Sequence, residues 1–238
     1  MKKWKYHIGI VFFVAFLVVL FVLTKQRNSA RKLTNKGVEF VGRENLFVTE
    51  DFVNKMLKET PDKDGFLTKE TLDLKLVEQR IKKQKHIEDA EVYVTVNGEV
   101  GANVVQRTPI ARVFSSIPFY LDAEGFEMPL SSNYAIRVPL VYGYKKTHKK
   151  DLLSLLNYMK NDEFLKKLVI GVYCLPKNDF LLKLRDQQFS VKLGGISNQK
   201  LKFENLKAFY AKAKKDTLFD AYKYVNLEIT NQVICTKV

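Results

Sequence analysis

The stretch Ala90–Val104, AEVYVTVNGEVGANV, determines the first part of the fold, because two runs of alternating apolar and polar residues flank an Asn-Gly pair. A two-residue turn at that pair would divide the apolar residues between the two faces of the hairpin. A three-residue loop over 96–98 instead places Val94 opposite Val100 and collects the apolar residues on one face. We therefore predict this loop, with Gly98 in the left-handed conformation that its bulge position requires.

The residues before this hairpin predict a strand and two helices, so that residues 38–108 form a small βααββ unit. The strand is Val38–Val41, and the first helix follows Thr49, the predicted N-cap, with acidic residues in its first turn. A helix-breaking cluster at Pro61–Gly65 precedes the second helix, expected over 71–84. Both helices should cover the apolar face of the sheet through the stripes Phe52, Val53, Met56 and Leu57, then Leu74, Val77 and Ile81.

Residues 109–238 predict a second, mostly antiparallel β domain with flanking helices, which makes the chain α+β in class. Short alternating runs separated by turn residues are typical of such a domain. Amphipathic helices are expected over 151–163 and 201–212. The expected strands are Phe119–Asp122, Glu127–Pro129, Val138–Tyr142, Leu168–Leu175, Phe180–Leu184, Phe189–Leu193, Val225–Ile229 and Val233–Cys235.

An apolar run near the N-terminus predicts a single membrane span. Ile8–Leu23, IGIVFFVAFLVVLFVL, has sixteen residues without a charge, and we predict a transmembrane helix over 8–24. A tail over 1–7 precedes it and a polar juxtamembrane linker over 25–37 follows it. A cleaved signal peptide is the alternative, but its apolar core usually has only about 7–15 residues. Basic residues on both sides of the run leave the orientation open.

The net charge of the chain is concentrated at its start. Lys and Arg number 40 against 26 Asp and Glu, a formal charge of +14. Residues 1–38 contain eight basic residues and no acidic residue, which leaves +6 on the remainder. Because much of the excess flanks an apolar segment, a strongly basic nucleic-acid-binding domain is excluded. The hydrophobic content of 46% supports a packed core and excludes intrinsic disorder.

Residues with catalytic or metal-binding chemistry form no recognisable constellation in the sequence. None of the three histidines stands near a Ser or Cys in a nucleophile motif, and His148 lies in a Lys-rich segment that predicts a solvated loop. Asp122 and Glu124 fall in a hairpin turn, where solvated carboxylates are expected. We therefore predict that the protein is not an enzyme and has no metal or cofactor.

The two cysteines, Cys174 and Cys235, are too few for a structural zinc site. They would be able to form one disulfide if the folded part lies outside the cytoplasm. The alternative is two buried free thiols in strands. The sequence leaves both possibilities open.

Two neighbouring segments give the chain a resemblance to a known family. Gln106–Arg112, QRTPIAR, followed by Phe119–Gly125, FYLDAEG, resembles the domain junction of the bacterial cell division protein FtsQ/DivIB, and the chain ending is similar to the Bacteroidetes branch of that family. The resemblance implies that the βααββ unit is a POTRA domain. It also implies a bitopic protein of the inner membrane at the division septum, with a short cytoplasmic N-terminus and a periplasmic body.

The resemblance further implies a role without catalysis. In that family the protein is a scaffold for divisome assembly, which links early division proteins to septal peptidoglycan synthesis. The implied partners are FtsB-like and FtsL-like bitopic proteins, with FtsK as a partner of the POTRA domain and no nucleic acid. One alternative is a POTRA-type export or assembly chaperone module. A less favoured one is a membrane-anchored hydrolase of cell-wall glycan.

The same resemblance implies a partner-binding site near the C-terminus, at Tyr224, Val225, Asn226, Leu227, Glu228 and Ile229. In the family, FtsB adds a strand at this position, so we expect an edge strand with unpaired N–H and C=O groups. By alternation, Leu227 and Ile229 should face the core and leave Tyr224, Asn226 and Glu228 outward. Asn226 and Glu228 replace the family's usual Asp and Arg, so backbone pairing is expected to matter more than side-chain contacts. In the alternative, Val225–Ile229 is a buried strand and Val233–Cys235 forms the edge.

Overall fold

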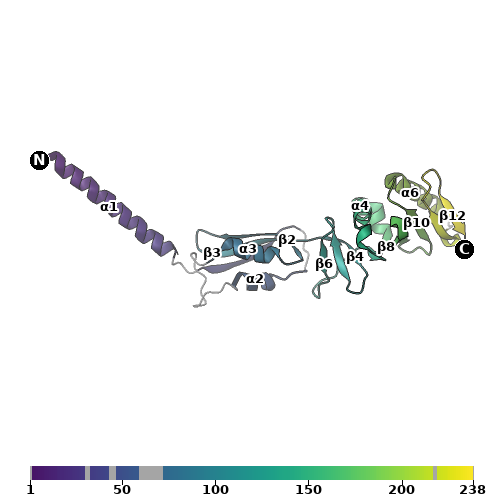
Figure 1. Ribbon diagram of the computed structural model, residues 1–238, viewed down its shortest axis with the longest axis horizontal. Coiled ribbons are helices and arrows are strands. Elements are labelled where there is room, and N and C mark those ends of the chain that lie inside the picture. The colour runs from purple at the N-terminus through teal and green to yellow at the C-terminus, as the bar shows by residue number, and fades with distance from the viewer. Residues whose placement is uncertain (1, 30–32, 43–46, 59–71, 217–218, 238) are drawn as a thin grey trace. The chain divides into compact units, whose positions relative to one another are not determined.

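The computed structural model describes residues 2–29, 33–42, 47–58, 72–216 and 219–237, and the chain divides into two compact units (Figure 1). Unit 1 is Met1–Gln106 and unit 2 is Arg107–Val238. The boundary predicted after residue 108 falls two residues past this division. The helix-breaking cluster predicted at Pro61–Gly65 lies outside the described residues.

The apolar run at the N-terminus forms a single long helix, α1 (Lys2–Ser29). Its segment Gly9–Arg27 is long and apolar enough to cross a membrane, with a mean hydropathy of 2.3. The helix continues past the predicted end at residue 24 and takes up the first part of the predicted linker. The reason is that Lys, Gln and Arg, which follow the apolar run, are good helix formers.

The rest of unit 1 has the predicted element order βααββ. In its three-stranded sheet β3 is central, with β1 parallel on one side and β2 antiparallel on the other. The first strand begins at Thr34, before the predicted Val38, because backbone pairing with β3 needs no apolar side chain. The bounds are β1 (Thr34–Phe40), α2 (Glu50–Lys58), α3 (Leu74–Lys82), β2 (Ile87–Val94) and β3 (Glu99–Gln106).

The hairpin of β2 and β3 has the register predicted from the sequence. Val94 lies opposite Val100, and Gly98 in the loop has a left-handed φ of +83°. Gly101 lies opposite Tyr93, and a Cβ at this glycine would come within 2.7 Å of the Tyr93 Cζ atom. The missing side chain of Gly101 therefore makes room for the tyrosine ring of the neighbouring strand.

The core of unit 1 contains most of the predicted apolar stripes. Thr49 caps α2, since its Oγ1 accepts a hydrogen bond from the Phe52 N–H at 3.3 Å. Phe52 itself is 45% exposed, so its predicted place in the core is wrong. A stripe centred on Val53 and Leu57 leaves position 52 at its margin. The buried hydrophobic residues of unit 1 are Phe47, Val48, Val53, Met56, Leu57, Leu72, Val77, Ile81, Ile87, Ala90, Val92, Val100, Ala102 and Val104.

Unit 2 is built on a nine-stranded, mostly antiparallel sheet, as predicted. Five of its eight strand pairs are antiparallel and three are parallel. The strand order is β12-β11-β10-β9-β8-β7-β4-β5-β6, so β12 and β6 are the outer strands. The bounds are β4 (Pro109–Val113), β5 (Phe119–Asp122), β6 (Glu127–Pro129), β7 (Leu140–Tyr142), β8 (Val169–Leu175), β9 (Asp179–Leu184), β10 (Ser190–Gly194), β11 (Tyr222–Asn226) and β12 (Ile234–Lys237).

The helices of unit 2 pack on this sheet and enclose its core (Figure 1). The helix predicted over 151–163 ends at Asn161, because Asp162 is extended and accepts hydrogen bonds from the N–H groups of Phe164 and Leu165, both at 3.0 Å, as the N-cap of a further helix. The helices are α4 (Lys149–Asn161), α5 (Glu163–Leu168) and α6 (Gln199–Lys215), with 3₁₀ turns η1 (Lys146–His148), η2 (Pro176–Asn178) and η3 (Phe219–Ala221). The central buried row of the sheet is Val141, Val172, Leu182, Val191 and Val225.

Two polar residues that were expected in solvent are buried. Asp122 is 5% exposed and forms an ion pair with Arg107, whereas the Glu124 side chain is 78% exposed. His148 is also 5% exposed, and its Nδ1 accepts a hydrogen bond from the Lys145 N–H at 3.2 Å. The Lys-rich segment is thus a short turn that leads into α4, in which the imidazole folds back on its own backbone.

The two cysteines are free thiols on different strands. Cys174 lies in β8 and Cys235 in β12, which are separated by three intervening strands. Four strand spacings amount to about 19 Å, well beyond the roughly 7 Å that a disulfide can bridge between Cα atoms. The disulfide left open by the sequence is therefore not formed within the chain.

Candidate functional site

The strand predicted to be an edge is an inner strand of the sheet. β11 pairs in parallel with β10 on one side and antiparallel with β12 on the other. Val225 lies opposite Val191 and opposite Cys235, so the backbone of this strand has a neighbour on both sides. The prediction that residues 224–229 form the edge is wrong, and the alternative, with the edge in the last strand, agrees with the structure.

The apolar residues of the predicted site divide between core and surface. Val225 and Leu227 are 0% and 1% exposed and belong to the core. Ile229 is 50% exposed, so its predicted position facing the core is wrong. The reason is that β11 ends at Asn226, and strand alternation no longer applies three residues later.

The polar residues of the predicted site contact their own neighbours. The Asn226 side chain donates to Glu228 Oε2 at 2.9 Å and accepts from the Glu228 N–H at 2.8 Å. These bonds form a local turn that ends the strand. The ring of Tyr224 lies 5.1 Å from Lys192 Nζ and 6.0 Å from Lys223 Nζ, within cation–π range.

The edge of the sheet next to the predicted site is β12. In the part of the chain that the structure describes, this strand pairs with β11 alone, through Thr236 opposite Tyr224 and Ile234 opposite Asn226. An antiparallel edge strand directs the N–H and C=O groups of alternate residues away from its neighbour. The sequence signal for this strand is weak, because Ile234–Lys237 is short and half polar.

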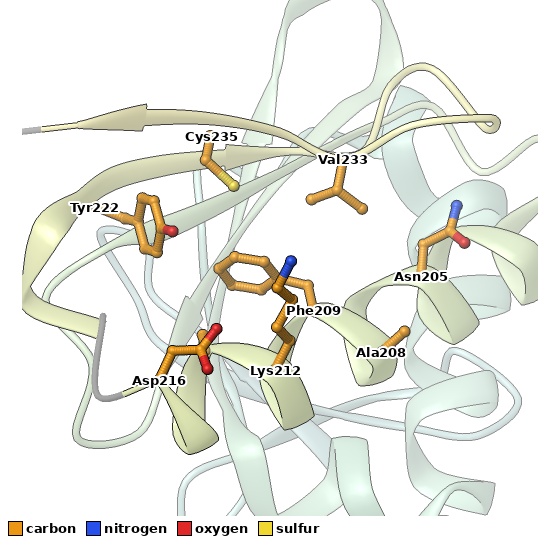
Figure 2. Close-up of a pocket in the computed structure, with 9 residues that line it drawn as sticks. Asn205, Ala208, Phe209, Lys212, Asp216, Tyr222, Val233 and Cys235 are labelled. Atoms are coloured by element: carbon orange, nitrogen blue, oxygen red, sulfur yellow. The ribbon is translucent and has the colours of Figure 1, made fainter.

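A groove lies beside this edge, between α6 and the hairpin of β11 and β12 (Figure 2). Its volume is about 400 Å³. Figure 2 shows the side chains of Val233 and Cys235 directed from the hairpin toward the Phe209 ring on α6. The lining residues are Asn205, Ala208, Phe209, Lys212, Ala213, Asp216, Tyr222, Val233 and Cys235.

The two walls of the groove are held together by contacts at its ends. Asn205 Nδ2 donates to the Thr230 carbonyl, which belongs to the connection between β11 and β12, at 2.7 Å. Phe209 packs edge-on against Tyr222 with the ring centroids 5.5 Å apart. The groove is therefore formed by α6 and the hairpin together, and no sequence pattern indicates it because the two elements meet only in the folded chain.

The lining of the groove is largely apolar. Its floor is apolar, and the charged side chains on its lining are those of Lys212 and Asp216. Burial raises the pKa of the Cys235 thiol, which makes it a poor nucleophile at neutral pH. Among the described residues no group of three or more His, Cys, Asp or Glu side chains has the arrangement to hold a metal ion. An apolar groove beside unpaired backbone groups is the arrangement that receives an added strand with an anchoring side chain.

A comparison with known proteins locates this region within a family. A family model described as FtsQ/DivIB, C-terminal related, matches residues 108–236. The matched range is more than half of the chain and contains the groove and nearly all of β12. No curated protein matches the chain.

Proposed function

The chain belongs to the FtsQ/DivIB, C-terminal related family of cell division proteins, and from this premise we propose that it acts without catalysis, as a membrane-anchored docking platform of the division complex. Its partner-binding site is the outer edge of β12 together with the adjoining groove. The main support for this proposal is that β12 is an outer strand of the sheet.

Strand addition at β12 is supported by what this edge offers a partner. A strand added there gains backbone hydrogen bonds, and its alternate side chains lie over the two faces of the sheet. On one face they reach the groove, where Phe209 and Val233 give an apolar surface for an anchoring side chain. On the other face of the sheet lie the side chains of Ile234, which is 42% exposed, and of Tyr224, which is opposite Thr236 of β12.

The proposed partner site, β12, is therefore the strand next to the one predicted from the sequence. Residues 224–226 support the edge from within the sheet, and all members of the predicted site except Val225 and Leu227 keep exposed surface near it. The substitutions of Asn226 and Glu228 relative to the family then matter less for a partner, because these two side chains bond to each other. Binding through the backbone tolerates such changes.

The membrane anchor sets where this platform works. We place the short N-terminus in the cytoplasm, α1 across the inner membrane and both units in the periplasm at the septum. FtsB-like and FtsL-like bitopic proteins are the proposed partners of β12, and an FtsK-like protein that of unit 1. The charge on both sides of the apolar run does not decide the orientation, so a protease-protection assay on sealed vesicles is its direct test.

Proline substitutions in β12 test the partner site. The full chain is coexpressed in membranes with tagged FtsB-like and FtsL-like proteins, and copurification is compared for Cys235→Pro and Thr236→Pro. Because N–H groups of successive residues point alternately inward and outward, one of the two substitutions removes a bond to β11 and the other removes an outward donor. The variant that loses the outward donor should keep the melting temperature of the parent chain and lose the partners.

A substitution at the other outer strand is the matched control. Glu127→Ala in β6 leaves β12 unchanged and should copurify with the partners as the parent chain does. If both proline variants stay folded and still retain the partners, the binding site lies elsewhere and the proposal for β12 fails.

A further inference from the structure

A buried lysine is hydrogen-bonded to the end of β10, the strand next to the β11–β12 hairpin. Lys202 in the first turns of α6 is 3% exposed. Its Nζ donates to the Leu193 carbonyl at 2.9 Å and to the Gly195 carbonyl at 2.8 Å. A buried ammonium group is costly unless it is hydrogen-bonded, so these two bonds are needed to keep it inside.

The Leu193 and Gly195 carbonyls lie on either side of Gly194, the last residue of β10. Gly194, between them, has a left-handed φ of +66°, and a Cβ there would come within 2.8 Å of Glu228 Cγ. Two residues earlier, the Lys192 carbonyl accepts a hydrogen bond from the Leu227 N–H at 2.8 Å. The path of the backbone at 193–195 therefore determines where the segment after β11 can lie.

The charges around this lysine come from two other segments. Burial lowers the pKa of Lys202, while the negative charges of Asp179 and Glu228 act in the opposite direction. Asp179 is the first residue of β9, and Glu228 lies in the connection between β11 and β12. The ammonium group thus interacts with the end of β10 through the Leu193 carbonyl, with the start of β9 through Asp179, and with the connection between β11 and β12 through Glu228.

We propose that Lys202 is a positioning residue for the β12 edge, which fixes the end of β10 and, through Gly194 and Glu228, the position of the β11–β12 hairpin against α6. Asn205, nearly one helical turn further along α6, makes the second connection through the Thr230 carbonyl. Together they set the two walls of the groove at a fixed separation. The purpose of this arrangement rests on the proposed function, but its local effect does not depend on a partner.

Hydrogen exchange on the full chain, without any partner, tests this role. Lys202→Met removes one donor from each of these two carbonyls, and the amide of Leu227 and the amides of β12 that bond to β11 should exchange about tenfold faster. The amides of the hairpin in unit 1 should be unchanged. Lys200→Met, at an exposed position of the same helix, should leave all of these amides as in the parent chain.

Conservative variants separate positioning from general support. Lys202→Arg and Lys202→Gln each keep at least two N–H donors for the carbonyls, and should restore at least part of the protection at Leu227 and at the amides of β12 that bond to β11. Should Lys202→Met fail to fold, the Gln variant carries the test, with an intermediate rise in exchange at the same amides. Protection of these amides equal to that of the parent chain in the Met variant, or in the Gln variant if the Met variant does not fold, would overturn the inference. Faster exchange at the β11–β12 hairpin of the Lys202 variants, together with intact partner binding, would support the positioning role of Lys202 and count against β12 as the partner site.

Discussion

Arg107 Nη1 lies 2.8 Å from Asp122 Oδ2, and this ion pair joins the first residue of unit 2 to the end of β5. The other carboxylate oxygen of Asp122 accepts hydrogen bonds from the N–H groups of Glu124 at 3.0 Å and Phe126 at 2.7 Å. The Arg107 guanidinium also lies 4.2 Å from the centroid of the Phe126 ring. One buried carboxylate therefore shapes the β5–β6 turn and holds the start of the domain.

Replacing this carboxylate should destabilise unit 2. Asp122→Ala leaves the half-buried Arg107 guanidinium without this carboxylate and the turn without its acceptor, at a cost of about 2–4 kcal/mol in the free energy of unfolding. Urea unfolding followed by circular dichroism measures the effect. Glu124→Ala, at a solvent-exposed position of the same turn, is the control and should change stability by less than about 0.5 kcal/mol. Equal losses in the two variants would contradict this account of Asp122.

Stability in acid should depend on Asp162, at the junction of α4 and α5. Burial acts to raise the pKa of Asp162, but hydrogen bonds from Lys207 and from the N–H groups of Leu165 and Phe164 outweigh it and lower the pKa. A lowered pKa in the folded state means that the stabilisation is present above the unfolded pKa of about 4 and is lost as the pH falls through the folded value. Asp162→Asn should therefore be less stable than the parent chain at neutral pH.

The pH dependence of that difference is the informative measurement. The gap in melting temperature between Asp162→Asn and the parent chain should narrow as the pH is lowered from 7 toward 3, because the carboxylate becomes protonated. Glu163→Gln, whose ion pair with Lys166 is exposed, should show no comparable trend. A gap that stays constant over this range would show that Asp162 acts only as a neutral cap.

The hairpin loop of unit 1 should be sensitive at its glycine. Gly98 has a φ of +83°, where a β-branched residue is strained, so Gly98→Val should lower stability by about 1–3 kcal/mol. Val96→Ala in the same loop, at a side chain 94% exposed, should have little effect. Thermal unfolding of unit 1 within the full chain compares the two. An unchanged melting transition in Gly98→Val would contradict the left-handed conformation of Gly98 in the 96–98 loop.

The two thiols should react at different rates. Burial raises the pKa of Cys174 to about 11, so that almost none of it is thiolate at pH 8, and the side chain is 8% exposed. Cys235 is less deeply buried and faces the groove. Timed alkylation with iodoacetamide, followed by mass spectrometry, should modify Cys235 first. The intact mass should be the same with and without reductant, and a difference of two protons would reveal a disulfide.

What the sequence predicts well in this protein are features decided by neighbouring residues. The register of the 87–106 hairpin follows from alternation and from the loop residue Gly98, because a slip of one position would turn every apolar side chain to the wrong face. The N-cap at Thr49 is equally local. The apolar run in α1 needs no tertiary contact to be recognised.

What only the tertiary structure decided is which strand lies at the edge and where the groove is. Val225 and Leu227 have the alternation of a strand, but alternation does not say whether the backbone has a neighbour on one side or on both. The half-polar Ile234–Lys237 covers β11 only after the chain has turned at 227–233. The burial of Lys202 and Asp122 has the same origin, since their partners are brought to them by folding. Sequence thus determined the elements and their faces, and their order in space was decided by long-range backbone pairing that no short pattern encodes.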